Sequence, residues 1–388
     1  MRVAILNWRD PWQRSAGGAE AFAHEVARGF VARGDTVDFL TSREPGQPRS
    51  ELHEGIRWLR RGGRWTVYAG VFGRLIRARL RGPAYDFVID CQNGIPFFSP
   101  LAVSRRRTGV AIVVHHVHDE QFATHFSRPL AALGRWLEGP AARQVYRRHT
   151  AVAVSESTIT AMRTRLRWTG AIELIHNGVA TEGFQRLSLP PALPLASASA
   201  PRLVAVGRLV RHKRLEHVLH LADDLAETWP GIEIHIIGRG PDESRIREAA
   251  SRLHHADRVH IHGHLATQAK NHLLQSAWLH LSASQGEGWG LSVLEAAALG
   301  VPTVAYDVDG LRDAIRDGVT GWLVPPGDTL ADTVSGVLKE LDSDPERASE
   351  VKGACLAWAA RFDWERTRNA MAQLAVRNSR APGTRTIE

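Results

Sequence analysis

The chain has few cysteines and no long apolar run. Its two cysteines among 388 residues, Cys91 and Cys355, lie too far apart in the sequence to suggest a disulfide framework or a cysteine-rich metal cluster. Disulfides are rare in reducing compartments, so we expect a cytoplasmic protein with buried, unpaired thiols. No apolar stretch reaches bilayer length, and Met1 opens a strand-like run without the leader of a secretory signal. We therefore expect neither a transmembrane helix nor a cleaved signal.

The chain is also poor in lysine, although it is basic. Its formal net charge is +8, and four of its 49 basic residues are lysines: Lys213, Lys270, Lys339 and Lys352. Arginine carries the rest of the positive charge, and it is concentrated between residues 57 and 107. The arginines there are Arg57, Arg60, Arg61, Arg64, Arg74, Arg77, Arg79, Arg81, Arg105, Arg106 and Arg107. Such an excess favours an acidic partner or a basic face.

Three hypotheses account for this basic run. Nucleic-acid binding is disfavoured, because the run lacks an ordered aromatic platform and any zinc or basic-helix signature. A solvated helix face is the ordinary explanation of a charge run. The third is an anionic partner, either a lipid-linked phosphate acceptor or the inner face of a membrane, where the protein would sit peripherally. We expect no nucleic-acid partner and leave the other two hypotheses open.

Length and pattern indicate two α/β domains. The chain suits two domains of about 180 residues each. In its first half, strands separated by helices predict a parallel sheet covered on both faces, so residues 1–186 form a Rossmann-like domain. The strands are predicted at 3–6, 37–40, 87–89, 110–114, 151–154 and 172–175, and the helices at 19–32, 67–80, 130–146 and 157–166.

The alternation restarts after a stretch rich in Pro, Ala and Ser. That stretch, residues 187–201, is the predicted linker. Residues 202–362 form a second Rossmann-like domain, and residues 363–388 begin with a helical run. The strands are predicted at 203–206, 232–237, 259–261, 278–281 and 303–305, and the helices at 215–226, 242–253 and 270–275. Two such domains in tandem bind ligands at the carboxyl ends of their strands.

A glycine-rich segment in the second domain carries the clearest sign of ligand binding. Residues 284–302 read SQGEGWGLSVLEAAALGVP and follow a predicted strand. Its glycines let the backbone approach a ligand, and the free N–H groups of the following helix favour a phosphate. Glu287 and Glu295 do not suit an anion alone, but they suit one that also carries hydroxyl groups. A nucleotide sugar carries both.

Each glutamate also has a purely structural interpretation. Ser292 and Glu295 have the spacing of a helix capping box. Glu287 can equally be a solvated acid in a loop. The segment taken alone leaves these interpretations open.

The embedding sequence resembles a known family. Glu-Gly-Trp-Gly-Leu-Ser-Val-Leu-Glu-Ala followed by Leu-Gly-Val-Pro resembles the donor-site signature of the retaining glycosyltransferases of family 4. The resemblance implies the GT-B fold, two Rossmann-like domains facing across a cleft, with the last helix returning to the first domain. It implies that Glu287 holds sugar hydroxyls and that Glu295 holds the ribose. It also assigns donor contacts to Gly288, Trp289, Gly290, Leu291 and Ser292. It is strong over 202–328 and weaker over 41–110, where such enzymes choose acceptors.

Other segments extend the resemblance. After the strand at 203–206, Arg208 and Lys213 match the family's diphosphate-binding pair, although an exposed basic turn is an alternative. Gly17 and Gly18 match its N-terminal glycine loop, a weak signal because any tight turn can use two glycines. Gly263 lies in the segment that contacts the base in this family.

The segment His115-His116-Val117-His118-Asp119 admits two functional interpretations. A metal site is disfavoured, because the adjacent His115 and His116 point to opposite faces of a strand. The segment resembles a turn of family 4 enzymes in which one histidine, here His118, faces the donor sugar. An ordinary core or surface histidine remains the alternative.

These residues predict a retaining glycosyltransferase. It would move a sugar from a UDP- or GDP-linked donor to a hydroxyl of a sugar, glycan, natural product or lipid-linked acceptor, with no cofactor. Catalysis is assigned to Glu287, His118, Arg208 and Lys213. We expect no metal, because the Asp-x-Asp triplet at 307–309 suits a turn or helix cap. A GT-B sugar-nucleotide epimerase and a noncatalytic basic adaptor for membrane or RNA are the alternatives.

Overall fold

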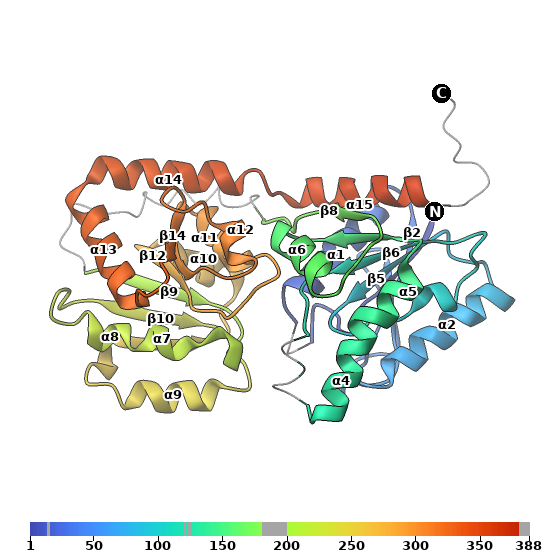
Figure 1. Ribbon diagram of the computed structural model, residues 1–388, viewed down its shortest axis with the longest axis horizontal. Helices are drawn as coiled ribbons and strands as arrows, with labels where there is room; N and C mark the ends of the chain where they lie inside the picture. The colour runs from blue at the N-terminus through green and yellow to red at the C-terminus, as the bar shows by residue number, and fades with distance from the viewer. Residues whose placement is uncertain (14–15, 120–121, 123–125, 181–199, 380–388) are drawn as a thin grey trace. The chain divides into compact units, whose positions relative to one another are not determined.

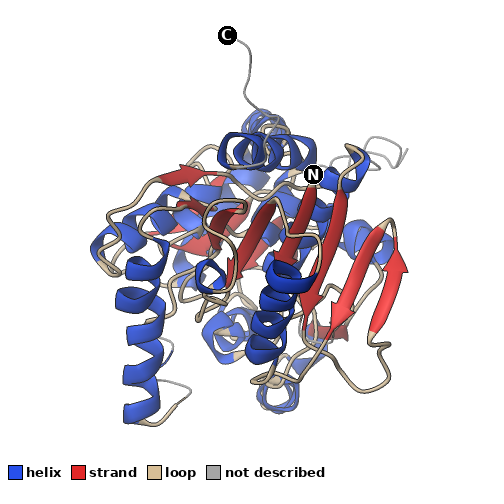
Figure 2. Ribbon diagram, turned by 90° about the vertical axis from the view of Figure 1, so that its right-hand side faces the viewer, coloured by secondary structure: helices blue, strands red, loops and turns tan. Residues whose placement is uncertain are grey.

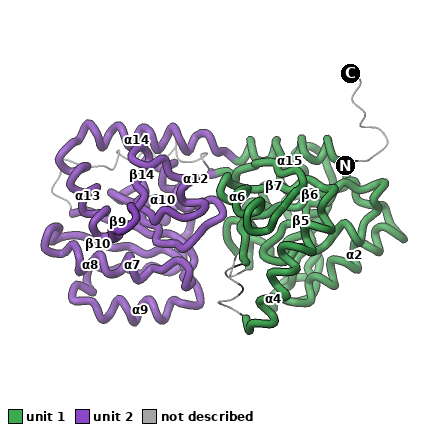
Figure 3. The backbone as a smooth tube through the Cα atoms, in the orientation of Figure 1, with its two compact units in different colours: residues 1–178, 364–388 green, residues 179–363 purple. Residues whose placement is uncertain are grey.

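The computed structural model describes residues 1–13, 16–119, 122, 126–180 and 200–379. Two compact units divide the chain: Met1–Gly178 together with Trp364–Glu388, and Val179–Asp363 (Figure 3). The predicted linker at 187–201 lies outside the described residues except for its last two positions. Of the predicted C-terminal segment 363–388, the described part ends at residue 379.

The first unit is built on an eight-stranded sheet (Figure 1). In space its strands follow the order β3-β4-β2-β1-β5-β6-β7-β8, and every neighbouring pair is parallel except β3 with β4. The strands are β1 Arg2–Leu6, β2 Thr36–Thr41, β3 Ser50–His53, β4 Ile56–Arg60, β5 Phe87–Gln92, β6 Gly109–Val114, β7 Thr150–Ala153 and β8 Ile172–Leu174. The parallel order is that of a Rossmann-like sheet, as the alternating pattern predicts.

Helices cover both faces of this sheet (Figure 2). Strand side chains alternate between faces: Val3 and Ile5 pack with α1 and α15, whereas Ala4 and Leu6 pack with α2, α5 and α6. The last helix of the chain therefore belongs to the core of the first unit. The helices are α1 Gly18–Ala32, α2 Val67–Arg81, η1 Ser99–Leu101, α4 Arg128–Trp136, the π-helical η2 Leu137–Ala141, α5 Ala142–Tyr146, α6 Glu156–Thr164 and α15 Trp364–Asn378.

The second unit is built on a six-stranded parallel sheet of order β11-β10-β9-β12-β13-β14. Its strands are β9 Arg202–Val206, β10 Glu233–Ile237, β11 Val259–Gly263, β12 Leu279–Ser282, β13 Thr303–Tyr306 and β14 Gly321–Val324. Its helices are η3 Arg211–Lys213, α7 Leu215–Leu219, α8 Leu221–Asp224, α9 Glu243–Ser251, η4 Ala256–Arg258, α10 Thr267–Gln275, α11 Leu291–Ala297, α12 Leu311–Ala314, α13 Leu330–Ser343 and α14 Pro345–Ala359. Because β9 and β12 are neighbours, the loops after them meet at one edge.

The hairpin of β3 and β4, absent from the sequence prediction, is anchored by a buried ion pair. Arg60 Nε at the end of β4 donates to Asp10 Oδ2 at 2.6 Å, and the two side chains are 2% and 0% exposed. Asp10 also accepts from the backbone N–H of Trp12 at 3.1 Å and from Gln47 Nε2 at 3.1 Å. An arginine of the basic run is thus an internal anchor, which holds the loop after β1 against the hairpin.

We expect Arg60→Ala to destabilise the protein by about 3 kcal/mol. This is the lower end of the range for breaking a buried ion pair, because Trp12 and Gln47 still donate to the Asp10 left behind. Equilibrium urea unfolding followed by circular dichroism measures the change. The exposed Arg79 of α2 provides the matched control, and Arg79→Ala should stay within about 0.5 kcal/mol of wild type. Equal stability of the two variants would contradict an anchoring role.

Candidate active site

Two loops of the second unit are hydrogen-bonded together at the carboxyl edge of its sheet. One follows β9 and the other follows β12. The backbone N–H of Gln285 donates to the carbonyl of His212 at 2.8 Å. Arg214 crosses between the loops: its Nε donates to the carbonyl of Ala283 at 2.8 Å and its Nη2 to that of Ser284 at 3.1 Å. Arg214 adopts a left-handed backbone with φ +46°. Sequence analysis did not single out this residue.

These loops bring Lys213 and Glu287 into contact. Lys213 Nζ donates to Glu287 Oε1 in an ion pair, and Ser284 Oγ donates to the same oxygen at 2.7 Å. Burial raises the pKa of Glu287, but the charge of Lys213 and the hydrogen bonds from Lys213 and Ser284 lower it more, so the net pKa is below its ordinary value. Glu287 is 19% exposed and ionised at neutral pH. It is a fixed carboxylate and not a solvated loop acid.

Glycines let this loop fit against its neighbours. The backbone N–H of Glu287 donates to the carbonyl of Asp309 at 2.9 Å. Gly310, at φ +77°, lies so close that a Cβ there would overlap the backbone of Glu287 and Gly288. On the other side, a Cβ at Gly207 would lie 3.5 Å from Lys213 Cε and Nζ. Lys213 therefore lies along the backbone of the β9 loop, which also carries the half-buried Arg208.

Glu295 does not form the capping box that its spacing suggests. Helix α11 has Gly290 as its N-cap with no side-chain cap, and Ser292 lies inside its first turn. Glu295 Oε2 instead accepts from Lys270 Nζ at 2.7 Å, and the glutamate side chain is 32% exposed. Both glutamates of the signature are thus ion-paired to lysines. Leu291 is half-buried.

The remaining residues predicted in this unit form the frame of the site. The ring of Trp289 is 3% exposed and meets Phe362 edge-to-face at 5.0 Å, so the ring belongs to the core. Gly263 ends β11 with φ +68°, and its carbonyl accepts from the backbone N–H of Gly238 at 2.8 Å. A Cβ at Gly238 would overlap the carbonyl of Gly207. The glycines after β9, β10 and β11 therefore pack backbone against backbone.

In the first unit, the predicted residues follow the carboxyl ends of β1 and β6. Helix α1 begins at Gly18, and Glu20 Oε2 accepts from the backbone N–H of Gly17 at 2.7 Å. Residues 14 and 15 of that loop are not described. Between β1 and β6 lies β5, whose loop is tied to that of β1 because Asn93 Nδ2 donates to Asn7 Oδ1 at 2.7 Å. Neither asparagine was predicted from the sequence.

His118 is held by a buried acid. Its backbone N–H donates to Glu138 Oε1 at 2.7 Å, its ring Nδ1 lies 3.4 Å from the same oxygen, and its side chain is 26% exposed. His115 is a core residue: its ring packs edge-to-face on Phe22 of α1, and burial lowers its pKa to about 3. Asp119 pairs with Arg165. Among the described residues, the one group spaced for a metal ion is elsewhere, at Glu233, His235 and His260.

The Asp-x-Asp triplet lies in a turn, as its sequence predicts. Arg312 Nε donates to Asp307 Oδ1 at 2.7 Å, and Arg312 Nη1 donates to Asp309 Oδ1 at 3.1 Å. Both carboxylates are therefore paired to one guanidinium, and the sequence leads directly into α12.

The basic run divides into arginines paired with buried acids and exposed arginines for which no ion pair is described. Arg57 pairs with the buried Asp38, with its Nε at 2.6 Å from Asp38 Oδ1, and Arg60 pairs with Asp10. Exposed arginines remain on and before α2: Arg61, Arg64, Arg77, Arg79 and Arg81. Among them lie two exposed apolar side chains, Trp65 and Leu80. Within the ranges that the structure describes, no helix is long and apolar enough to cross a bilayer.

Solved structures with the same architecture define the fold class of this chain. Sucrose-phosphate synthase from Thermosynechococcus elongatus superposes with a TM-score of 0.75 at 19% identity, over 96% of this chain and 98% of that one. The Anabaena protein HepE, solved in complex with UDP, superposes with a TM-score of 0.74 at 18% identity, over 96% and 99% of the two chains. The two units therefore have the GT-B fold, which confirms the predicted fold class.

Sequence comparison places the chain within this class. The model of "Glycosyltransferase Family 4" matches residues 16–182, and that of "Glycosyl transferases group 1" matches residues 195–352. The glycogen synthase of Mycobacterium tuberculosis is 28% identical over 99% of this chain and 97% of its own length. The chain belongs to the group 1, family 4 glycosyltransferases, which are retaining enzymes with nucleotide-sugar donors. Family membership decides against both the epimerase and the noncatalytic adaptor.

Proposed function

We propose that this enzyme transfers a sugar from a nucleoside diphosphate sugar to an acceptor hydroxyl without a divalent metal ion. The observation that carries the proposal is the shared contact at Glu287. Lys213 and Ser284 both donate to Oε1 of this ionised carboxylate, and no described group donates to Oε2. A fixed acceptor oxygen lies next to a fixed positive charge. A nucleotide sugar needs this combination, because its sugar hydroxyls require an acceptor and its diphosphate requires a positive charge.

The charge that develops during transfer determines the remaining roles. Glycosyl transfer breaks the bond between the anomeric carbon and a phosphate oxygen, so negative charge grows on the leaving diphosphate while the sugar becomes oxocarbenium-like. Lys213, Arg208 and the backbone N–H groups of Gly290 and Leu291 are assigned to the diphosphate. Donors fixed before the reaction need no reorganisation when this charge appears.

The nucleotide is assigned to Glu295, about one turn further along α11, and to Gly263 at the end of β11. Glu295 would bind the ribose hydroxyls and Gly263 would lie against the base. The roles that the family resemblance gives His118, Gly17 and Gly18 toward the donor sugar are part of the same proposal. UDP in the crystal of HepE favours a UDP-linked donor over a GDP-linked one.

The first test separates the two glutamates. We expect Glu287→Ala to abolish transfer but to bind UDP almost as well as wild type, because Glu287 acts on the sugar. Glu295→Ala should bind UDP more weakly, because hydrogen bonds to the ribose are lost. Isothermal titration calorimetry with UDP and with GDP measures the nucleotide affinity of both variants and identifies the base. A transfer assay measures the loss of activity in Glu287→Ala.

Glu350→Ala is the matched control, since this glutamate is 72% exposed on α14. It should bind UDP and transfer sugar as wild type does. Strong and equal loss of UDP affinity in Glu287→Ala and Glu295→Ala would disprove the division of roles.

The second test concerns the metal. We expect transfer to survive a chelator, and Lys213→Ala to reduce kcat by roughly 100- to 1000-fold, the usual cost of removing one fixed donor to a developing anion. Lys339 lies exposed on α13 and supplies the lysine control, for which Lys339→Ala should leave the rate unchanged. Loss of transfer in chelator, with recovery in magnesium or manganese, would instead assign the diphosphate to Asp307 and Asp309.

The acceptor is proposed to be anionic or to lie at an anionic surface. This proposal is supported by the exposed part of the basic run. Trp65, just before α2, and Leu80, within α2, are exposed apolar side chains that neighbour exposed arginines in the sequence. Basic residues near a charged leaflet contribute about 1 kcal/mol each, and apolar side chains beside them can enter the head-group region. A lipid-linked phosphate acceptor at the inner face of the membrane fits this surface.

Replacing Arg77, Arg79 and Arg81 with Gln should weaken binding to anionic vesicles by roughly 100-fold at low salt, at about 1 kcal/mol per residue. Vesicle sedimentation with anionic and neutral lipid measures the effect. Replacing Arg247 and Arg252 on α9 provides the control, because these arginines are exposed on the second unit. If wild type binds anionic and neutral vesicles alike, the run is a solvated face and the acceptor is soluble.

A further inference from the structure

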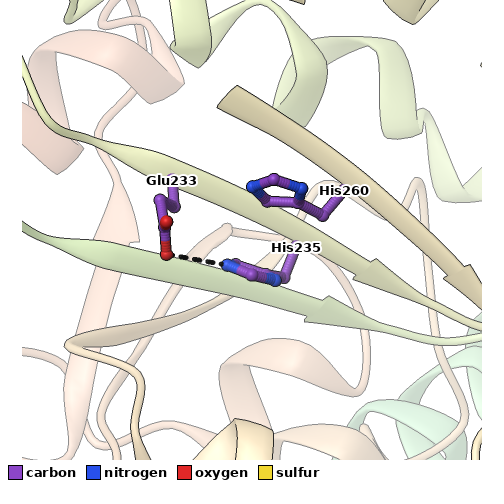
Figure 4. A group of neighbouring side chains, drawn as sticks. All are labelled: Glu233, His235 and His260. Atoms are coloured by element: carbon purple, nitrogen blue, oxygen red, sulfur yellow. Dashed lines mark hydrogen bonds and ion pairs between the residues drawn. The ribbon is translucent and has the colours of Figure 1, made fainter. Parts of the chain in front are cut away.

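A cluster of histidines lies on the edge of the second sheet, on strands β10 and β11. Strand β11 is the edge strand and pairs with β10, and the register places His235 opposite His260. Side chains two residues apart on a strand share a face. Glu233 and His235 on β10 therefore lie on the same face as His260 and His262 on β11, and Figure 4 shows Glu233, His235 and His260 together.

The donor atoms of three of these residues converge. One atom each from Glu233, His235 and His260 lies within 4.8 Å of the other two. His235 Nε2 is 3.2 Å from Glu233 Oε2, and its Nδ1 is 2.9 Å from His262 Nε2. The ring of His260 lies 4.7 Å from that of His235, centroid to centroid. Within the described residues, His260 contacts these imidazoles but makes no hydrogen bond.

Two of the histidines and the glutamate have shifted pKa values. Burial lowers the pKa of His235 to about 4, despite the hydrogen bond to Glu233, and burial together with His260 lowers that of His262. Burial raises the pKa of Glu233, but hydrogen bonds from His235 and Arg202 bring it below its ordinary value. These directions favour the neutral imidazole of His235 and the ionised carboxylate of Glu233, the forms in which the two groups bind metals.

We propose that Glu233, His235 and His260 bind one Zn²⁺ ion, with water in the fourth position. Two imidazoles and one carboxylate form a donor set that zinc accepts in tetrahedral geometry, whereas magnesium and calcium require oxygen ligands. Ligands about 2.1 Å from a tetrahedral ion lie roughly 3.4 Å apart. Small rotations of the three side chains bring their donor atoms to that spacing.

Outer contacts support the same geometry. When His235 Nε2 binds the ion, its Nδ1–H donates to His262 Nε2, which fixes the tautomer as second-shell partners of zinc ligands do. Arg202 is the opposing group, because its Nη2 lies 3.0 Å from Glu233 Oε2 and its charge weakens cation binding. Both hydrogen bonds from Arg202 use Oε2, and the contact of His235 Nε2 with Oε2 is given up when this nitrogen binds the ion, so Oε1 of Glu233 remains for the ion.

The position of the cluster points to an ion that supports the fold. Its carboxylate ligand, Glu233, begins β10 and lies five positions before Gly238, about 16 Å along the strand. An ion here links the edge strand β11 to β10 and protects an open sheet edge. This proposal goes beyond the proposed function and is compatible with transfer in chelator.

The test uses the full chain, freed of any affinity tag and of metal. Calorimetry should show one equivalent of Zn²⁺ bound, Co²⁺ should give the visible absorption of a tetrahedral site, and Zn²⁺ should raise the Tm saturably. His260→Ala and Glu233→Gln should each weaken Zn²⁺ binding by about 100-fold or more, and His262→Ala by roughly 10- to 100-fold. His254→Ala is the control, since its side chain is 92% exposed and outside the cluster.

Circular dichroism of the metal-free variants checks that each is folded; His260 and Glu233 are only partly buried, so both substitutions should be tolerated. Wild-type protein that binds no stoichiometric Zn²⁺ would overturn the proposal. So would His260→Ala and Glu233→Gln proteins that bind Zn²⁺ as wild type does. Transfer assays in chelator remain independent of both outcomes, so failure of this proposal leaves the proposed function standing, and the reverse also holds.

Discussion

The contact on which the site depends is the ion pair of Lys213 with Glu287. It joins the loops after two neighbouring strands, and every nearby constraint preserves it. Arg214 hydrogen-bonds the two loops to each other, and Gly310, which has no Cβ, lets the backbone of Glu287 and Gly288 pack directly against it. A partly buried carboxylate kept ionised by one ammonium is an electrostatic arrangement that exists before substrate arrives.

Most of the fold could be predicted from local pattern. Alternating apolar runs and helical periods predicted β1, β2, the strands from β5 to β13 and both Rossmann-like sheets, because buried parallel strands are continuous apolar segments. β3, β4 and β14 were missed. β3 is exposed along its whole length, and β4 carries Arg57 and Arg60, which look like surface residues until Asp38 and Asp10 are placed beside them. Ion pairs distant in sequence leave no periodic signal.

The candidate site was predictable where a single segment carries it. The glycines and glutamates of residues 284–302 are contiguous, so their spacing was visible. The capping box, which the spacing of Ser292 and Glu295 left open as an alternative, does not form, since α11 begins at Leu291 and places Ser292 in its first turn. The contacts of Arg214 and of the histidine cluster could not be predicted from a single segment, because each joins residues on neighbouring strands or on the loops that follow them. Glu-Ile-His and His-Ile-His patterns were legible on two successive strands, but only the pairing of β10 with β11 brings them together.

The scarcity of lysine has a consequence at the site. Of the four lysines, two contact the two signature glutamates, in a chain that uses arginine nearly everywhere else. An arginine at position 213 would present a planar fork that grips both oxygens of a carboxylate. A compact ammonium takes one oxygen and leaves the other exposed to a ligand. The chain thus has lysine at the two positions where a glutamate must be ion-paired and still have one carboxylate oxygen able to accept a hydrogen bond from a ligand.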